Sequence, residues 1–134
     1  MDFGDPTANQ VLADTMLEFM RKKQGIGLAS TQVGLTKRVF VMEIDGKQKV
    51  CFNPEIVQAS QTQVEFNEGC LSFKGDQCII KRPDEISVRY QNYRGDWYME
   101  RLSGLWARCF QHELDHLDGI TMWDRHKQQN AKQS

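Results

Sequence analysis

The residues best suited to chemistry in this chain form the run His112-Glu113-Leu114-Asp115-His116. On an α-helix, side chains four residues apart lie one above the other, so His112 and His116 can bind one metal ion together. Glu113 lies beside the first histidine, where its carboxylate can reach a water molecule on that metal. A catalytic site of this kind normally has three protein ligands and one open position. The chain must therefore supply a third ligand.

The residues after His116 offer no convincing third ligand. Met122 occupies the position at which the metzincin pattern has its last histidine. A thermolysin-like site needs a glutamate from a later helix, and the polar stretch after Met122 is too short to form one. His126 is interpreted as a solvated histidine rather than a ligand. The third ligand is therefore expected upstream.

Four cysteines are the upstream candidates. Cys51 and Cys78 lie in apolar, strand-like runs, which indicates small buried side chains. Cys109 shares a helix face with the histidines but lies seven residues from His116, a rise of about 10 Å, too far for metal bonds of about 2.0 to 2.3 Å. Cys70 is different, because it follows a glycine in a polar stretch where the backbone can approach closely. It is the best candidate.

Three segments of the chain resemble the signature motifs of peptide deformylases. They are Gly25–Gln32, Glu68–Ser72 and Gln111–Leu117. The first departs from the family pattern G-x-G-L-A-A-x-Q only at Ser30. Three motifs in the right order make a chance match far less probable than a lone H-E-x-x-H would. The resemblance implies a metal-dependent hydrolase that removes the N-formyl group from the formylmethionine of new polypeptides and releases formate.

The resemblance also implies the metal site. One divalent ion is expected on Cys70, His112 and His116. This set of donors suits Zn²⁺, Fe²⁺, Co²⁺ or Ni²⁺. The resemblance implies Fe²⁺ in the cell, with the other ions possible in purified protein.

The expected catalytic residues are Glu113, Gln32 and Leu71. Glu113 would accept the proton of the attacking water and pass it to the departing amine. The Gln32 amide and the Leu71 backbone N–H would bind the oxyanion. Without the other motifs, Gln32 would be interpreted as a loop cap. Asp115 and Asp118 are expected to be solvated or to orient their neighbours, and for Asp115 a role in holding a ligand histidine is equally open.

Substrate recognition is implied by the resemblance alone. An extended formylmethionyl peptide would pair with backbone near Gly27 and near Glu68-Gly69. The methionine side chain would enter a pocket at whose wall Arg108 is a departure, because this wall is usually apolar in the family. Either the alkyl stem of Arg108 lines the wall or the charge changes the preference. The expected substrate-binding residues are Gly25, Ile26, Gly27, Glu68, Gly69, Leu105, Arg108 and Cys109.

The elements that position these residues follow from the hydrophobic pattern. A helix is expected from Asp5-Pro6 to Gly25, and a second, carrying the histidines, from Ser103 to Gly119. The fold class is therefore α+β, with antiparallel sheets around a central metal-binding helix and one N-terminal helix. Strands are expected at residues 38–44, 49–52, 55–59, 62–66, 78–81, 86–91 and 97–101. Asp45-Gly46 and Arg94-Gly95 are expected as turns, and Asn53-Pro54 is expected to end the strand at residues 49–52.

Length and charge agree with a small enzyme. The 134 residues support a single catalytic domain over residues 1–134, with a polar tail from about residue 125. A net charge of -1, from 17 basic and 18 acidic residues, gives no case for binding nucleic acid or membrane. No apolar run approaches the roughly 20 residues of a membrane span. A reducing cytoplasm is expected, because the cysteines lack disulfide-framework spacing. The chain is expected to be a monomer.

The two ends of the sequence suggest a short form of the family. The chain lacks the usual N-terminal entry segment and stops about where bacterial relatives begin a C-terminal helix, as in the phage-encoded deformylases that it resembles. The bacterial host cytoplasm would then be its location. Docking on the ribosome by that helix is not expected, although acting on nascent chains implies transient proximity to ribosomes.

Three other interpretations compete with a deformylase site. A purely structural metal site would need a fourth protein ligand, and no further Cys or His is well placed. A small metallopeptidase of another type would cleave unformylated peptides. An inactive binder of formylated N-termini would not need Glu113 and Gln32.

Overall fold

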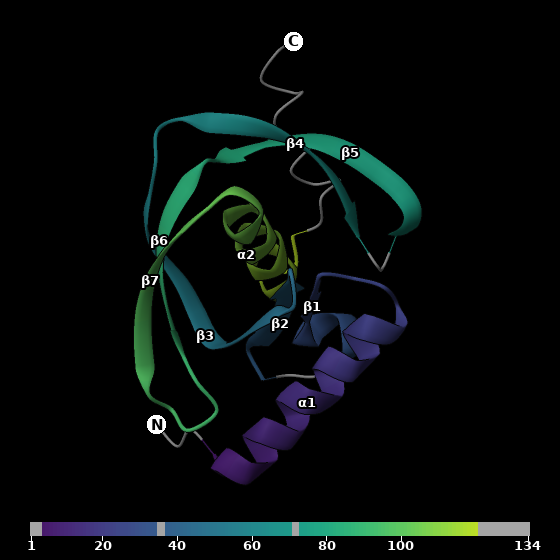
Figure 1. Ribbon diagram of the computed structural model, residues 1–134, viewed down its shortest axis with the longest axis vertical. Helices are drawn as coiled ribbons and strands as arrows, with labels where there is room; N and C mark the ends of the chain where they lie inside the picture. The colour runs from purple at the N-terminus through teal and green to yellow at the C-terminus, as the bar shows by residue number, and fades with distance from the viewer. Residues whose placement is uncertain (1–3, 35–36, 71–72, 121–134) are drawn as a thin grey trace.

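The fold places a long helix between two antiparallel sheets (Figure 1). The structure is a computed structural model and describes residues 4–34, 37–70 and 73–120. This architecture confirms the expected α+β class. Its elements in chain order are α1 (Pro6–Lys22), β1 (Gly27–Ala29), the short 3-10 helix η1 (Ser30–Val33), β2 (Val39–Ile44), β3 (Lys47–Ala59), β4 (Gln63–Cys70), β5 (Phe73–Pro83), β6 (Glu85–Gln91), β7 (Trp97–Ser103) and α2 (Gly104–Leu117).

Helix α1 begins as the sequence predicts. The Asp5 side chain accepts a hydrogen bond from the backbone N–H of Thr7 at 3.1 Å, which satisfies one of the donors at the helix start. Met16 and Met20 are buried against the sheet. Phe19 of the same helix is 40% exposed, with the Lys23 ammonium 5.7 Å from its ring centroid.

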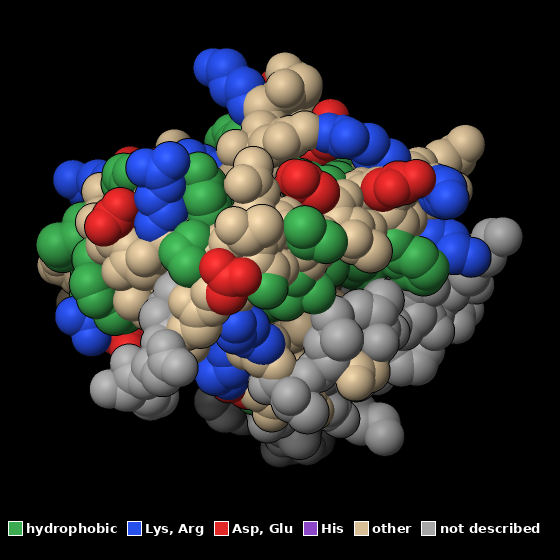
Figure 2. Space-filling model, turned by 90° about the horizontal axis from the view of Figure 1, so that it is seen from below, with side chains coloured by type: hydrophobic (Ala, Val, Ile, Leu, Met, Phe, Trp, Pro, Cys, Tyr) green, Lys and Arg blue, Asp and Glu red, His purple; other side chains and the backbone are tan. Residues whose placement is uncertain are grey.

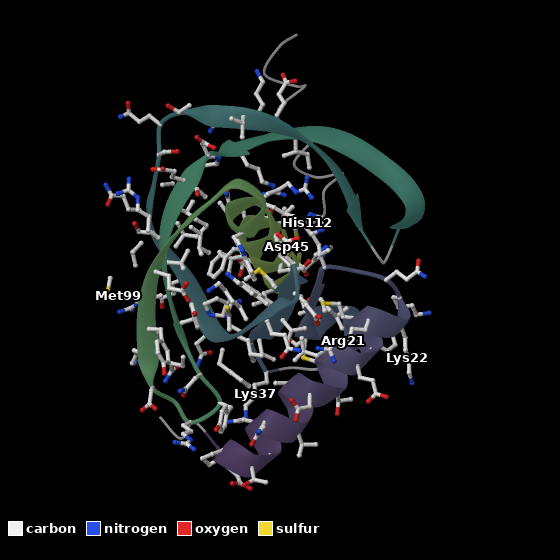
Figure 3. All side chains as sticks on the ribbon, viewed as in Figure 1. Arg21, Lys22, Lys37, Asp45, Met99 and His112 are labelled. Atoms are coloured by element: carbon white, nitrogen blue, oxygen red, sulfur yellow. The ribbon has the colours of Figure 1, made fainter. Side chains whose placement is uncertain are left out.

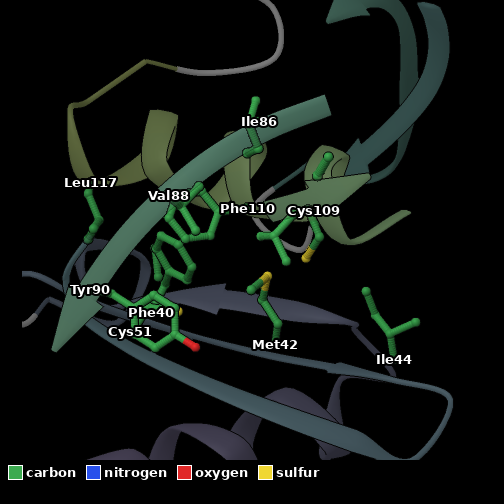
Figure 4. Close-up of a cluster of buried hydrophobic side chains, with 13 residues drawn as sticks. Phe40, Met42, Ile44, Cys51, Ile86, Val88, Tyr90, Cys109, Phe110 and Leu117 are labelled. Carbon is green, nitrogen blue, oxygen red and sulfur yellow. The ribbon is translucent and has the colours of Figure 1, made fainter. Parts of the chain in front are cut away.

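The five-stranded sheet has the order β1-β2-β3-β6-β7, and both of its faces are covered at β2. Val39 and Val41 point to the side of α1, whereas Phe40 and Met42 point to the side of α2. Phe40 meets Phe110 of α2 edge to face, with ring centroids 4.9 Å apart. Figure 4 shows the buried apolar cluster on the α2 side of the sheet, which includes Phe40, Met42 and Phe110. The sheet thus fixes α2 through a packed core.

Strand β3 differs from the sequence prediction. The Asp45-Gly46 turn is confirmed, with φ of 53° and 76°. Asn53-Pro54 does not end the strand, however, and β3 continues to Ala59. The register with β6 shifts between Phe52 and Glu55, and Asn53 adopts a φ of 50°. A bulge of this kind accommodates a proline, which has no N–H for the ladder.

The second sheet, β4-β5, lies on the other side of α2 (Figure 1). Its strands are longer than the predicted 62–66 and 78–81, and their register runs from Gln63 opposite Pro83 to Gly69 opposite Gln77, with an irregularity before Cys70. This register places Cys70 at the end of β4.

The surface carries both signs of charge. Figure 2 shows basic and acidic side chains interspersed with apolar ones on the face that it displays. Of the helices that the structure describes, neither has the length and apolar character needed to cross a lipid bilayer.

Candidate active site

Helix α2 presents the chemically competent residues, and its ends are well defined. Ser103 occupies the N-cap position, as predicted, but its side chain makes no capping hydrogen bond. At the other end Gly119 adopts a φ of 76°, and its N–H donates to the His116 carbonyl at 3.1 Å. This left-handed glycine lies just past the end of the helix, three residues after the second histidine.

The two histidines converge. Their Nε2 atoms lie 3.0 Å apart, and the rings meet at 72° with centroids 4.7 Å apart. Each residue is only 9% exposed. Two nitrogens bound at about 2.0 to 2.1 Å to one tetrahedral ion would be about 3.3 Å apart, so this pair has nearly the spacing of two ligands of a single metal. The donors fit a divalent cation.

Glu113 lies in a cradle formed by the backbone of β1. The residue is 4% exposed, and its Oε1 atom is buried. A Cβ atom added to Gly27 would lie 2.6 Å from Glu113 Oε2 and 2.8 Å from Cys109 Sγ. Only glycine allows the strand to approach the carboxylate this closely.

The residues after β1 tie the first motif to the end of α2. The Thr31 hydroxyl donates to the His116 carbonyl at 2.8 Å. Ser30, the departure from the family motif, is fully buried and donates to the Lys37 carbonyl at 2.5 Å, so its extra hydroxyl is satisfied. Gln32 follows in η1, and its side chain lies outside the described residues.

Asp115 is buried, which rules out the solvated position that was one of its expected alternatives. Its Oδ2 atom lies 3.0 Å from Nη1 of Arg82 on β5, and the two residues are 6% and 4% exposed. The carboxylate remains on an inward helix face because a buried cation compensates it. Asp118, in contrast, is half-exposed and pairs with Arg38 at 2.9 Å.

The comparisons with known proteins agree on one family. The family model described as polypeptide deformylase matches residues 1–132. A peptide deformylase of Thermotoga neapolitana is 45% identical over 114 residues, which are 85% of this chain and 70% of that protein. The chain belongs to the peptide deformylase family.

Two solved structures are similar to it in fold. The crystal structure of the Thermotoga maritima peptide deformylase has a TM-score of 0.88 and 39% identity over 93% of this chain and 84% of that one. That of a probable peptide deformylase from Synechococcus phage S-SSM7 has a TM-score of 0.86 and 39% identity over 91% and 86%.

Membership of this family confirms the predicted activity. The chain is a hydrolase of protein biosynthesis that removes the N-formyl group from new polypeptides, and the family is metal-dependent. As in other peptide deformylases, its substrates are formylmethionyl peptides.

The structure places part of the expected substrate-binding set near this deformylase centre. Cys109 is buried, with Sγ 3.8 Å from the Ile26 carbonyl oxygen. Ile26 and Leu105 are 39% and 38% exposed, and Arg108 is half-buried. Gly25 donates its N–H to the Met20 carbonyl and so closes the end of α1.

The remaining predicted residues lie on or after β4. Glu68, Gly69 and Cys70 belong to this strand, but their side chains are outside the described residues, and Leu71 is not described. Their roles therefore stay predictions.

Two residues that support the deformylase site were not predicted from the sequence. Arg82 was missed although an arginine close to the apolar pair Ile79-Ile80 is a usable signal for a buried ion pair. Thr31 was missed because its contact joins residues 85 positions apart, which no local pattern reveals.

Proposed function

We propose that this peptide deformylase holds one divalent metal ion through Cys70, His112 and His116. The observation that carries the proposal is the convergence of the two Nε2 atoms at 3.0 Å on a nearly buried helix face. Among the described residues, no group of three His, Cys, Asp or Glu side chains is placed to hold a metal. A third ligand from β4, whose last side chains lie outside those residues, is consistent with this, and Cys70 is the soft donor there.

The metal supplies Lewis-acid activation of water near neutral pH when it is bound. Fe²⁺ is proposed as the ion in the cell, with Zn²⁺, Ni²⁺ or Co²⁺ as replacements, because a thiolate and two imidazoles suit all four.

Glu113 is proposed as the general base and then the general acid. Its carboxylate accepts the proton of the water that attacks the formyl carbon, and later donates it to the departing amine. Contact with Gly27 fixes its position, so the proton acceptor is held ready before the substrate arrives. The Gln32 side chain and the Leu71 N–H are proposed to stabilise the negative charge that develops on the formyl oxygen.

The peptide is proposed to extend the five-stranded sheet at β1. Of the strands that the structure describes, only β2 pairs with β1, so Gly27–Ala29 form a sheet edge beside Glu113. An extended substrate with its formyl group at this end would add a strand. Its first side chain would lie against Ile26, Leu105 and the stem of Arg108.

The setting of the reaction follows from the substrate. Formylated nascent chains are made in a bacterial-type cytoplasm, so we propose that the enzyme acts there, transiently near ribosomes. All proposed catalytic residues come from one chain, which makes the single chain the catalytic unit.

The test measures formate release from formyl-Met-Ala. Glu113→Gln should lower kcat by about 10²- to 10⁴-fold, the usual contribution of a general base. Glu43→Gln is the matched control, because Glu43 pairs with Arg21 on the surface and should leave the rate unchanged. A Glu113→Gln enzyme with more than a tenth of the native rate would contradict the proposed role.

The ligand set has its own test. Cys70→Ala should reduce bound metal from one ion per chain to a small fraction, whereas Cys51→Ala, a change at a buried cysteine of the sheet, should not. Full metal content in Cys70→Ala would show that another residue is the third ligand.

A further inference from the structure

Strand β7 is the open edge of the five-stranded sheet opposite β1. Among the described strands it pairs only with β6. Trp97, Tyr98 and Met99, at its start, are 51%, 49% and 73% exposed. Figure 3 shows Met99 at the outer margin of the molecule, away from His112. Three adjacent apolar side chains on an unpaired edge are unusual, because such edges favour association with another strand.

The direction of the free backbone groups can be derived from the ladder between β6 and β7. The Asn92 N–H donates to the Asp96 carbonyl, which starts the hairpin with a hydrogen-bonded pair, and the register then runs without a shift to Glu85 opposite Ser103. Hydrogen-bonded pairs alternate along an antiparallel ladder. The even-numbered residues of β7 therefore bond to β6. The backbone N–H and C=O groups of Trp97, Met99 and Arg101 point to the open edge.

We propose that β7 pairs antiparallel with β7 of a second copy of this chain, around a two-fold axis at Met99. In this register Met99 faces Met99 of the other copy, and each Trp97 faces an Arg101. These are the residues whose backbone groups point outward, so each of the pairs can be hydrogen-bonded. The two sheets become one continuous sheet, and the contact is the same patch on both partners, as a closed dimer requires.

Charge disfavours the registers in which the axis moves toward the end of β7. A shift of the axis to Glu100 would place two glutamates opposite each other, and a shift to Arg101 would place two arginines opposite each other, both of which are unfavourable. With the axis at Met99, each Glu100 faces a Tyr98, and the arginine guanidinium can lie over the indole ring. The indole already accepts such a contact within the chain, since the Arg89 guanidinium lies 4.8 Å from the Trp97 ring centroid.

Existing contacts do not oppose the pairing. The Arg101 side chain is 76% exposed, and its ion pair with Glu85, which is 44% exposed, is a surface contact of the kind that contributes little. One shared strand buries less area than the roughly 800 Å² per partner of a standard interface. The dimer is therefore a weak one that depends on protein concentration.

Sedimentation velocity over a concentration series of the metal-loaded enzyme tests the proposal. The native mass should rise from 15.6 kDa toward twice that value with increasing concentration.

Two variants should both remain monomeric. Met99→Lys places like charges at the axis, and Met99→Pro removes an outward N–H without breaking the ladder with β6. Val57→Lys is the control, because Val57 is also an exposed side chain of this sheet but lies on β3, which β6 separates from β7. Each variant should keep the native rate of formate release. A native protein that stays at 15.6 kDa throughout, as it would if the edge served a different partner, or equal association of both Met99 variants, would overturn the proposal.

Cysteine cross-linking tests the register. Residues in a hydrogen-bonded pair have Cα atoms about 5.5 Å apart, within disulfide range. Under mild oxidation Met99→Cys should cross-link with itself. Trp97→Cys and Arg101→Cys should each form no disulfide-linked dimer alone but should cross-link with each other when mixed. Self-cross-linking of Trp97→Cys, or none in Met99→Cys, would contradict an axis at Met99.

Discussion

At the scale of single residues, Gly27 is the most constrained position near the proposed base. Gly27→Ala would place a methyl group 2.6 Å from Glu113 Oε2 and 2.8 Å from Cys109 Sγ, so at least one side chain must move. A displacement of about 1 Å at a catalytic group can cost about 100-fold in rate. We expect kcat for formate release to fall by about 10- to 100-fold while the protein remains folded by circular dichroism.

A double variant separates the two contacts. Gly27→Ala combined with Cys109→Ala removes the conflict with sulfur but leaves the conflict with the carboxylate. If displacement of Glu113 causes the loss, the double variant stays slow. Recovery of the native rate would instead assign the effect to packing around Cys109.

For single residues, the sequence predicts which side chains can bind a metal, but it does not predict how deeply a charged side chain is buried. The spacing of His112 and His116 is a property of any helix, so their convergence is predictable. The burial of Asp115 is not, because the compensating Arg82 lies 33 residues away in the sequence.

At the scale of elements, the Arg82–Asp115 ion pair links α2 to β5, and thereby to the sheet that carries Cys70. Asp115→Asn would remove the carboxylate that lies 3.0 Å from this buried guanidinium, and breaking a buried ion pair typically costs about 3 to 5 kcal/mol. We expect a free energy of unfolding lower by this amount in urea titrations, and a faster loss of metal to a chelator.

The matched control is Asp118→Asn. Its pair with Arg38 has a similar distance, 2.9 Å, but both side chains are more than 40% exposed. Exposed pairs contribute about 0 to 1 kcal/mol. Equal effects of the two substitutions would mean that burial does not govern the contribution of the Asp115 pair.

A second link between elements depends on pH. Glu100 of β7 accepts hydrogen bonds from Lys49 of β3 and Tyr90 of β6. Burial opposes ionisation, but the hydrogen bonds from these two residues outweigh it and lower the pKa of Glu100 below its ordinary 4.5. The carboxylate therefore stabilises the fold above pH 4.5, and this contribution is lost as the pH falls through the lower pKa of the folded state.

Glu100→Gln tests this dependence. Urea unfolding at pH 7 should show a loss of about 1 to 2 kcal/mol relative to the native protein, as for a partly exposed hydrogen-bonded charge. The difference should shrink as the pH is lowered below 4.5. A difference that is constant from pH 7 to pH 3 would contradict the assigned pKa direction.

The elements that the sequence predicts are those with strong local signals. Asp5-Pro6 and Asp45-Gly46 mark a helix start and a hairpin, and both are confirmed. Strand β1 has only three residues and follows a glycine-rich turn, so no periodicity reveals it. The bulge at Asn53-Pro54 has the same sequence signature as a strand end, and only the pairing of β3 with β6 distinguishes the two.

At the scale of the whole molecule, α2 lies between a sheet that it packs against and a second sheet that carries the proposed third ligand (Figure 1). The apolar core joins the helix to the five-stranded sheet. The β4-β5 sheet contacts the helix through the buried Arg82–Asp115 ion pair, through the hydrogen bond from the Gln111 side chain to the Pro83 carbonyl and, as proposed, through the metal. Among the described side chains, neither apolar cluster includes a residue of β4 or β5, so the proposed metal would add a link between the two parts of the fold.

This arrangement predicts that metal removal destabilises the whole molecule. A ligand that binds only the folded state at 100 times its dissociation constant adds about 2.7 kcal/mol. For a chain of this size that corresponds to a melting temperature higher by about 10 °C. Calorimetry of the chelator-treated and the iron-reloaded enzyme should show this difference in melting temperature.

Two cysteine variants provide the control. In Cys70→Ser the difference should nearly vanish, because the link to β4 is lost. Cys51→Ser should retain the difference, since Cys51 is buried in the sheet core. Identical melting temperatures with and without metal, once metal analysis confirms its removal, would show that the ion acts in catalysis without joining the two sheets.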